Sequence, residues 1–160
     1  MDKKYAIIRL VIALCLVLVS GHSLAKSPPK SPAKANAAGA LTIDLTVIQA
    51  SKNGAIDTRI DPELKKQLQR TFSDGFKGFT YIEKHAVSVN HADSVVKRLK
   101  NKKVIALSNM GRDGAKLRVR LDFDGANVMM RVREGELWFH ARRQKGDKAL
   151  ILAVRARSKQ

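Results

Sequence analysis

The side chains that most often carry out catalysis or bind metals are few in this sequence and are not arranged for either role. Beyond residue 25 the histidines are His85, His91 and His140, and none is followed four residues later by a second His or an acid. A helical metal site needs that spacing, so ordinary strand or loop positions explain these histidines better. Asp122 and Asp124 before a glycine resemble part of a calcium loop, but the later Glu is missing and a turn explains them.

Motif searches also indicate a protein without an active site. The sequence has no glycine-rich phosphate loop before a helix, no G-x-S-x-G nucleophile elbow and no H-E-x-x-H zinc motif. Its single cysteine, Cys15, lies in a segment that we expect to be removed, which excludes thiol catalysis and disulfides in the remaining chain. We therefore predict no catalytic residue, no cofactor and no metal. An enzyme of unrecognised type is the remaining alternative.

Residues 1–25 are typical of a secretory signal peptide. Three cations precede an apolar run at 10–19, which is too short to cross a bilayer as a helix. Ser23 and Ala25 place small residues at the two positions that a signal peptidase reads, so we predict cleavage before Lys26. A retained membrane anchor is the alternative, but residues 20–22 (SGH) interrupt the apolar run early. We expect a periplasmic or secreted protein.

The chain that remains is strongly basic. Without the three cations and one acid of residues 1–25 it carries 28 Lys and Arg against 13 Asp and Glu, a net charge of about +15. Such an excess favours anionic surroundings or partners but does not specify a fold. Residues 26–39 hold three of the four prolines and are predicted to form a linker, and residues 40–160 have the length of a single domain.

Residues 116–157 alternate apolar and charged side chains, a pattern that predicts four consecutive antiparallel strands. Two-residue turns are expected at Asp124-Gly125, Glu134-Gly135 and Gly146-Asp147. The inner pairs are then Leu121 with Val128, Val119 with Met130, Met130 with Phe139, Ala141 with Leu152, and Phe139 with Val154. Because every partner is apolar, we expect one inward face in all four strands.

The earlier part of the domain predicts more strands and one helix. Alternation indicates strands at 41–50 and 79–89, the second bending near His85, and further strands at 94–99 and 103–108. A helix over 93–100 is the alternative for the third of these. Asp61 before a proline predicts a helix that starts at Pro62 and ends near residue 72. We expect Ile105 and Leu107 to face inward, opposite Leu121 and Val119 respectively.

These elements predict a strand-rich α+β fold, in which one short helix packs on a mostly antiparallel sheet that closes as a half-barrel or a sandwich. The same register gives the outer face a candidate binding site. It consists of Arg118, Arg131, Trp138 and Arg155 in one row, Arg120, Arg133 and His140 in the neighbouring rows, and Lys97, Arg98, Lys100, Lys102 and Lys103 at a basic tip. Arginines over the Trp138 ring would form cation–π contacts. An ordinary solvated strand face explains the charges equally well.

The arrangement resembles small exported proteins of Gram-negative bacteria that have no assigned function. The resemblance is carried by the signal segment, LTVIQAS at 45–51, the short helix, GFKGFTYIEKH at 75–85 and ALILAVRAR at 149–157. It implies a place in the cell envelope but no catalytic or binding residue. We therefore expect a non-catalytic protein that binds an anionic envelope component, such as lipopolysaccharide, an acidic glycan or lipid headgroups. The alternative is an adaptor that docks on an acidic envelope protein.

Overall fold

The computed structural model describes residues 39–159, so the predicted signal peptide and most of the predicted linker lie outside the described residues. This part of the chain forms eight strands and one helix, as the strand-rich α+β class predicts. In chain order the elements are β1 (Leu41–Ser51), α1 (Pro62–Phe72), β2 (Gly78–Val89), β3 (Ser94–Arg98), β4 (Val104–Asp113), β5 (Lys116–Phe123), β6 (Ala126–Arg133), β7 (Leu137–Arg143) and β8 (Lys148–Ser158).

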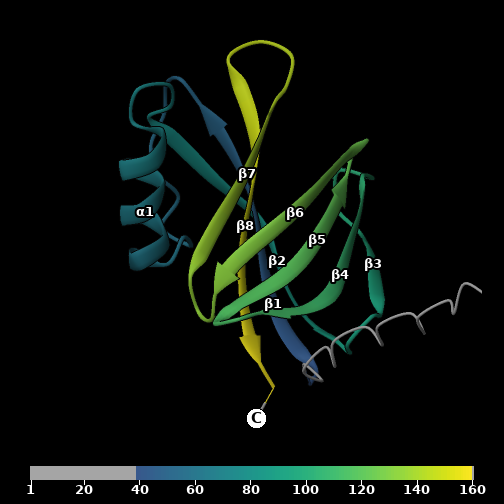
Figure 1. The fold of residues 1–160 in the computed structure, drawn as a ribbon. Helices are drawn as coiled ribbons and strands as arrows, with labels where there is room; N and C mark the ends of the chain where they lie inside the picture. Colours follow the sequence, from purple (N-terminus) through teal and green to yellow (C-terminus); the bar gives the residue numbers. More distant parts are fainter. Residues whose placement is uncertain (1–38, 160) are drawn as a thin grey trace, which may run out of the picture. The chain divides into compact units, whose positions relative to one another are not determined.

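The strands form two antiparallel sheets of four strands each (Figure 1). Sheet A has the strand order β2-β1-β8-β7 and sheet B the order β3-β4-β5-β6. Strands β1 and β8, from opposite ends of the described chain, lie next to each other in sheet A and pair from Leu41 with Ser158 to Ser51 with Lys148. Sheet B is a simple meander, in which each strand pairs with the next one along the sequence.

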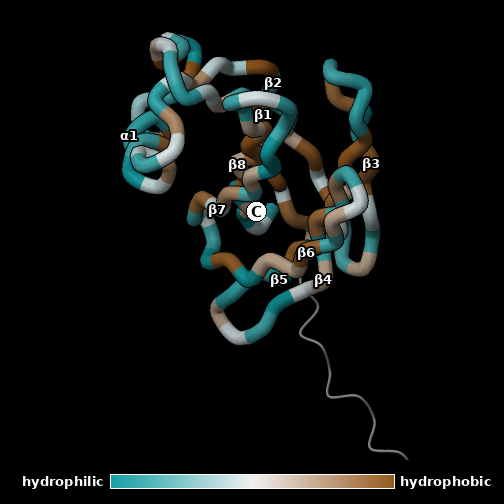
Figure 2. Tube along the Cα trace, turned by 90° about the horizontal axis from the view of Figure 1, so that it is seen from above, coloured by the Kyte–Doolittle hydropathy of each residue, from teal (hydrophilic) through white to brown (hydrophobic). Residues whose placement is uncertain are grey.

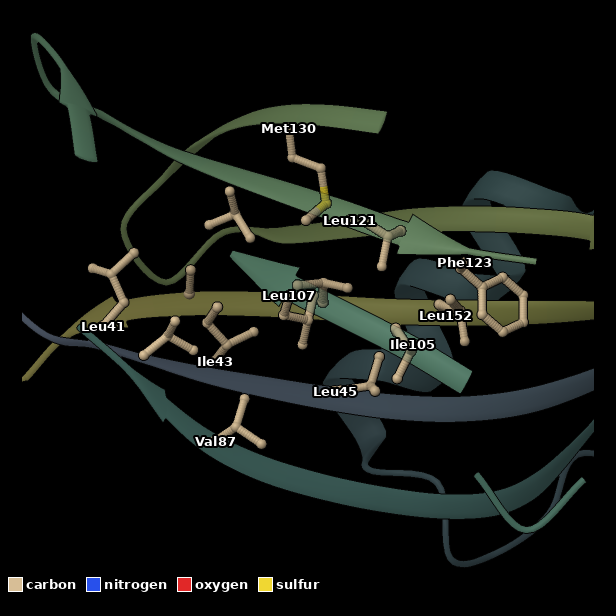
Figure 3. Close-up of a cluster of buried hydrophobic side chains, with 14 of the residues drawn as sticks. Leu41, Ile43, Leu45, Val87, Ile105, Leu107, Leu121, Phe123, Met130 and Leu152 are labelled. Carbon is tan, nitrogen blue, oxygen red and sulfur yellow. The ribbon is translucent and has the colours of Figure 1, made fainter. Parts of the chain in front are cut away.

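The main core is made of side chains from the facing sides of both sheets (Figure 3). Leu45 and Leu152 come from sheet A, whereas Leu107, Leu121 and Phe123 come from sheet B, and each is at most 1% exposed. Period-2 alternation explains why these residues share a side, because every second side chain of a strand points to the same face. Burying these apolar side chains is the largest favourable contribution to the free energy of folding.

Helix α1 covers part of the other face of sheet A (Figures 1 and 2). Its buried Leu64 and Leu68 pack in a second apolar cluster that includes Ile48 of β1 and Ile151 of β8. The predicted start of the helix is confirmed, since the carboxylate of Asp61 accepts hydrogen bonds from the first turn, at 3.0 and 3.2 Å. Strand β8 is therefore buried on both faces, which explains its continuous apolar run, ALILAV.

Strands β2 and β3 refine the prediction. The pairing of β2 with β1 stays regular at His85; the irregularity comes between Val47 and Ile48, whose partners are Glu83 and Tyr81. The irregularity in the pairing of β2 therefore lies near Ile82, three residues before the predicted bend. Residues 94–98 form a strand, so the alternative helix over 93–100 is wrong.

Strand β4 has the predicted inward face but different partners. Ile105 lies opposite Phe123, and Leu107 lies opposite Leu121, two residues away from the predicted pairing. The strand continues to Asp113 through an irregularity after Asn109. The fully buried Asn109 side chain accepts a 2.9 Å hydrogen bond from the Gly111 amide and donates to the Val89 carbonyl at 3.1 Å. This side chain replaces the ladder hydrogen bonds that are lost at the bulge.

The predicted four-strand meander at the end of the chain is wrong, because its strands are divided between the two sheets. Strands β5 and β6 pair in the predicted register, but β7 pairs with β8 in sheet A and not with β6. After β6 the backbone docks on β8 instead: the Gly135 amide donates to the Ala156 carbonyl at 2.9 Å, and the Ser158 amide donates to the Glu134 carboxylate at 2.6 Å.

The register of β7 with β8 is also one residue away from the predicted one. Gln144 donates its amide to the Lys148 carbonyl, so residues 145–147 form a three-residue loop in place of the predicted two-residue turn. His140 now lies opposite Leu152, and Phe139 lies opposite Ala153. Since side chains alternate between faces, this slip inverts β7.

Candidate functional site

Cations gather on the outer face of sheet B. Across β5 and β6, Lys116 lies opposite Arg133, and Arg118 lies opposite Arg131, as the sequence predicts. Arg120 occupies the next row, opposite Met129. These five side chains alternate with buried apolar residues, so the core on one side of the strands places them on the other. We call the five cations, Lys116, Arg118, Arg120, Arg131 and Arg133, the basic face.

Few carboxylates balance the basic face. Arg131 forms an ion pair with Asp113 at 3.8 Å, between two largely exposed side chains, and such pairs contribute little. The other four cations form no ion pair with any residue of the described part of the chain. Asp122 is the other acid on this side of β5, where it lies opposite Asn127. The basic face therefore keeps a net positive charge.

Grouping these cations lowers the stability of the fold, and Arg118 is the clearest example. Its side chain lies opposite another arginine, and like charges in directly opposed positions destabilise a sheet. Its Nε is buried and has no hydrogen-bond partner within the described residues. An unmatched buried donor carries a desolvation cost. An anion placed between Arg118 and Arg131 would reduce their repulsion.

Trp138 and His140 do not belong to the basic face, which corrects the prediction. Because β7 is inverted, Trp138 lies opposite Val154 on the core side of sheet A, where it is half-buried. Its ring stacks on that of His140, with centroids 6.0 Å apart and an interplanar angle of 8°. Burial, and to a smaller extent Arg142, lower the pKa of His140, which favours its neutral form. The predicted cation–π row around Trp138 therefore does not form.

Arg155 lies on a different surface again, the part of sheet A beside the start of α1. It forms a 2.9 Å ion pair with Glu63 and lines a cavity of about 130 Å³. Other walls of this cavity are Arg157, paired with Asp44 at 2.6 Å, and Arg59. This cavity was not predicted from the sequence, where its only signal is the charged end of the apolar β8. Its three arginines each have a carboxylate partner, so it offers less unbalanced charge than the basic face.

Hydrogen bonds to the carboxylate of Asp57 hold the rim of this cavity in place. Arg59 donates hydrogen bonds from its side chain and backbone to Asp57, and these hold the pKa of the carboxyl well below its usual range. The guanidinium of Arg59 also lies over the Tyr81 ring, 5.0 Å from its centroid. These contacts fix the loop before α1 against β2.

The predicted basic tip is the connection between β3 and β4. Lys97, Lys100 and Lys102 are exposed there, whereas Lys103 contacts the Asp124 carboxylate and lies 5.6 Å from the centre of the Phe123 ring. The Lys100 amide donates a 2.7 Å hydrogen bond to the buried Glu83, which anchors the loop. Arg98 is opposite Val104 at the end of the β3–β4 pair. Four of the five predicted tip residues are therefore exposed.

Exposed apolar residues lie on the same side of sheet B as the cations. Among the described residues the large apolar side chains most open to solvent are Val96 (62%), Val104 (46%) and Met129 (38%). Their chain neighbours Val95, Ile105 and Met130 belong to the core, so alternation turns these three outward. The sequence analysis missed them, although adjacent apolar pairs in alternating strands are a detectable signal. We call Val96, Val104 and Met129 the exposed apolar residues.

Comparisons with models of protein families, with curated proteins and with solved structures find no match to this chain. Within residues 39–159, no helix has the length and apolarity that crossing a membrane requires. The same residues contain no group of three or more His, Cys, Asp or Glu side chains placed to hold a metal ion.

Proposed function

We propose that this protein is an exported, non-catalytic binding protein of the cell envelope that holds an anionic polymer or surface through its basic face. The supporting observation is the opposed pair Arg118 and Arg131, flanked by Lys116 and Arg133; of these four, Arg131 alone has an ion-pair partner within the described residues, Asp113 at 3.8 Å. Repulsion between such neighbours lowers stability, and an anionic partner would offset it. Phosphates and carboxylates suit this role because guanidinium groups bind both strongly.

The location of the cations supports a binding role more than their number does. Elsewhere in the described chain, the arginines near the cavity beside α1 are matched to Asp57, Asp44 and Glu63. The basic face lies on a sheet surface that α1 does not cover, so a large partner has access to it (Figure 2). Lipopolysaccharide phosphates, acidic glycans and lipid headgroups are the candidate partners in the envelope.

The test compares two variants with the same change in charge. In Lys116→Glu/Arg133→Glu the reversal falls on the basic face, whereas in Lys65→Glu/Lys66→Glu it falls on exposed positions of α1. Binding to immobilised heparin and to anionic vesicles is measured at several salt concentrations. Wild-type affinity should fall log-linearly with salt, and the basic-face variant should bind about tenfold more weakly or worse, with a shallower slope.

The matched control decides the outcome. An equal loss of affinity in the α1 variant would show that total charge alone determines binding, and the proposed site would be wrong. A stoichiometric complex with an acidic envelope protein that persists at moderate salt would instead identify an adaptor subunit, the second candidate function.

A further inference from the structure

The exposed apolar residues lie beside the basic face, toward the end of sheet B that carries Asp122. Val96 is on β3 and Met129 on β6, the two edge strands of sheet B, and Val104 begins β4. Across the strands Met129 lies opposite Arg120, and Val104 lies opposite Arg98. Each of these two apolar side chains therefore has a cation as its cross-strand partner.

This combination has a recognisable physical use. Single exposed apolar residues are common on soluble proteins and need no explanation. Here, however, the three most exposed large apolar side chains of the described residues fall on one face, and that face also carries the unbalanced arginines. Surfaces that bind lipid headgroups combine apolar side chains, which enter the acyl boundary, with cations, which stay at the phosphates.

Resting on the proposed function, we propose that the partner of the basic face is the surface of an anionic lipid bilayer. A flat partner reaches Val96 and Met129 on opposite edges of sheet B at the same time, together with Arg120 beside Met129 and the other cations farther along β5 and β6. A linear polymer that follows the basic rows of β5 and β6 has no reason to contact β3. The presence of exposed apolar residues on both edge strands therefore favours a surface over a chain.

In the bound state the charged and apolar groups have separate tasks. The guanidinium groups of Arg118 and Arg131 hydrogen-bond lipid phosphates, which relieves their mutual repulsion. The side chains of Val96 and Val104 leave water and enter the boundary between headgroups and acyl chains. Binding consequently depends on both salt and apolar area.

The test removes apolar area without changing charge. Val96→Thr/Val104→Thr keeps both positions β-branched and nearly unchanged in volume, so β3 and β4 keep their strand preference. Vesicles of phosphatidylcholine with and without phosphatidylglycerol serve as the lipid probe, and heparin serves as the polymer probe. We expect the variant to lose about tenfold in affinity for the anionic vesicles and to bind heparin as the wild type does.

The lipid inference and the proposed function fail in different ways. Unchanged vesicle affinity in the threonine variant, with weaker binding in Lys116→Glu/Arg133→Glu, would overturn the lipid surface and leave an anionic polymer as the partner. Equal losses in Lys116→Glu/Arg133→Glu and Lys65→Glu/Lys66→Glu would overturn the basic face itself. An equal loss of heparin affinity in the threonine variant would also contradict the lipid inference.

A fluorescent label measures the contact directly. Cys15 is the only cysteine of the chain, so Val96→Cys in a Cys15→Ser background provides a single thiol for an environment-sensitive dye. On anionic vesicles the dye at position 96 should shift to the blue, as it does in an apolar medium. The same dye in Lys66→Cys, on exposed α1, is the control and should not shift. Equal shifts, or none at position 96, would contradict insertion through this face.

Discussion

Sheets A and B have the same number of strands, but they are covered differently. Sheet A packs on sheet B with one face and on α1 with part of the other, so residues 149–154 of β8 are all buried. Within residues 39–159, sheet B packs only through its inner face, and β5, one of its two central strands, alternates buried and more open residues. Sheet A therefore contributes burial on both sides, whereas sheet B leaves one side available for a partner.

The different covering of the two sheets limits where a binding surface can form. A residue of β8 is constrained by packing whichever way it points, and a charge there would be buried at high cost. On β5, only alternate positions are constrained by the core, so Lys116, Arg118 and Arg120 accumulate without disturbing it. The surface with the fewest packing constraints is the one that carries the unbalanced charge.

The strongest test of this contrast is a pair of neighbouring substitutions in β8. Leu152 is fully buried between the sheets and Ile151 is fully buried under α1. Leu152→Ala and Ile151→Ala should each lower the free energy of unfolding by about 2–5 kcal/mol, because each leaves a cavity. Urea denaturation measures both. A loss below about 1 kcal/mol for Ile151→Ala would show that α1 covers sheet A only loosely.

The same experiment in β5 should give unequal losses. Leu121 is fully buried, and its neighbour Arg120 points away from the core. Leu121→Ala should cost about 2–5 kcal/mol, whereas Arg120→Ala should change stability by no more than about 0.5 kcal/mol. Comparable large losses at both positions would mean that the outer face of sheet B is covered, and would remove the structural basis of the proposed binding surface.

A smaller effect concerns the acids that connect the two sheets. Asp124, in the turn between β5 and β6, pairs with Lys103 and, at 3.0 Å, with Arg142 of β7. The hydrogen bond from Lys103, and the charge of Arg142, lower the pKa of Asp124. Glu134 also has a lowered pKa, because the Ser158 amide and then Arg112 donate hydrogen bonds to it. Both carboxylates join sheet B to sheet A.

The sign of the pH dependence follows from these lowered pKa values. A carboxyl group with a lower pKa when folded stabilises the fold above its unfolded pKa, near 4, and loses this contribution as the pH falls further. The urea midpoint should therefore decrease below about pH 4, and less steeply in Asp124→Asn than in the wild type. Asp74→Asn, at an exposed acid that makes no ion pair within residues 39–159, is the control. Identical pH profiles for wild type and Asp124→Asn would contradict the role of Asp124.

Local signals in the sequence were sufficient where a turn type determined the pairing. Asp124 and Gly125 have positive φ values of 53° and 79°, the conformation of a two-residue hairpin turn, and the β5–β6 register follows. The start of α1 was equally predictable from Asp61 and the following proline. The cross-strand positions of the five residues of the basic face, all on β5 and β6, were consequently predicted correctly.

The rest of the site depended on information that is not local. Glu134-Gly135 does form a turn, closed by the Glu136 amide on the Arg133 carbonyl, but the Gly135 amide and the Glu134 carboxylate bond to β8, some 20 residues later, and β7 continues into the other sheet. Strand β7 has large side chains on both of its faces, because Trp138 and Phe139 are neighbours in the sequence. Alternation therefore cannot identify which face is the inner one. The loop between β7 and β8 has one residue more than predicted. This shifts the register of β7 by one residue and places Trp138 opposite Val154, away from the arginines of the basic face.

The pairing of β1 with β8 has a consequence for the order in which the protein folds. Leu41 of β1 pairs with Ser158 of β8, so the two central strands of sheet A pair fully only when all of residues 41–158 are present. Closing such a long loop is slow, and folds dominated by distant pairings typically require milliseconds to seconds. During synthesis β1 therefore remains without its β8 partner until the last strand emerges, and loss of the final strand would leave sheet A unassembled.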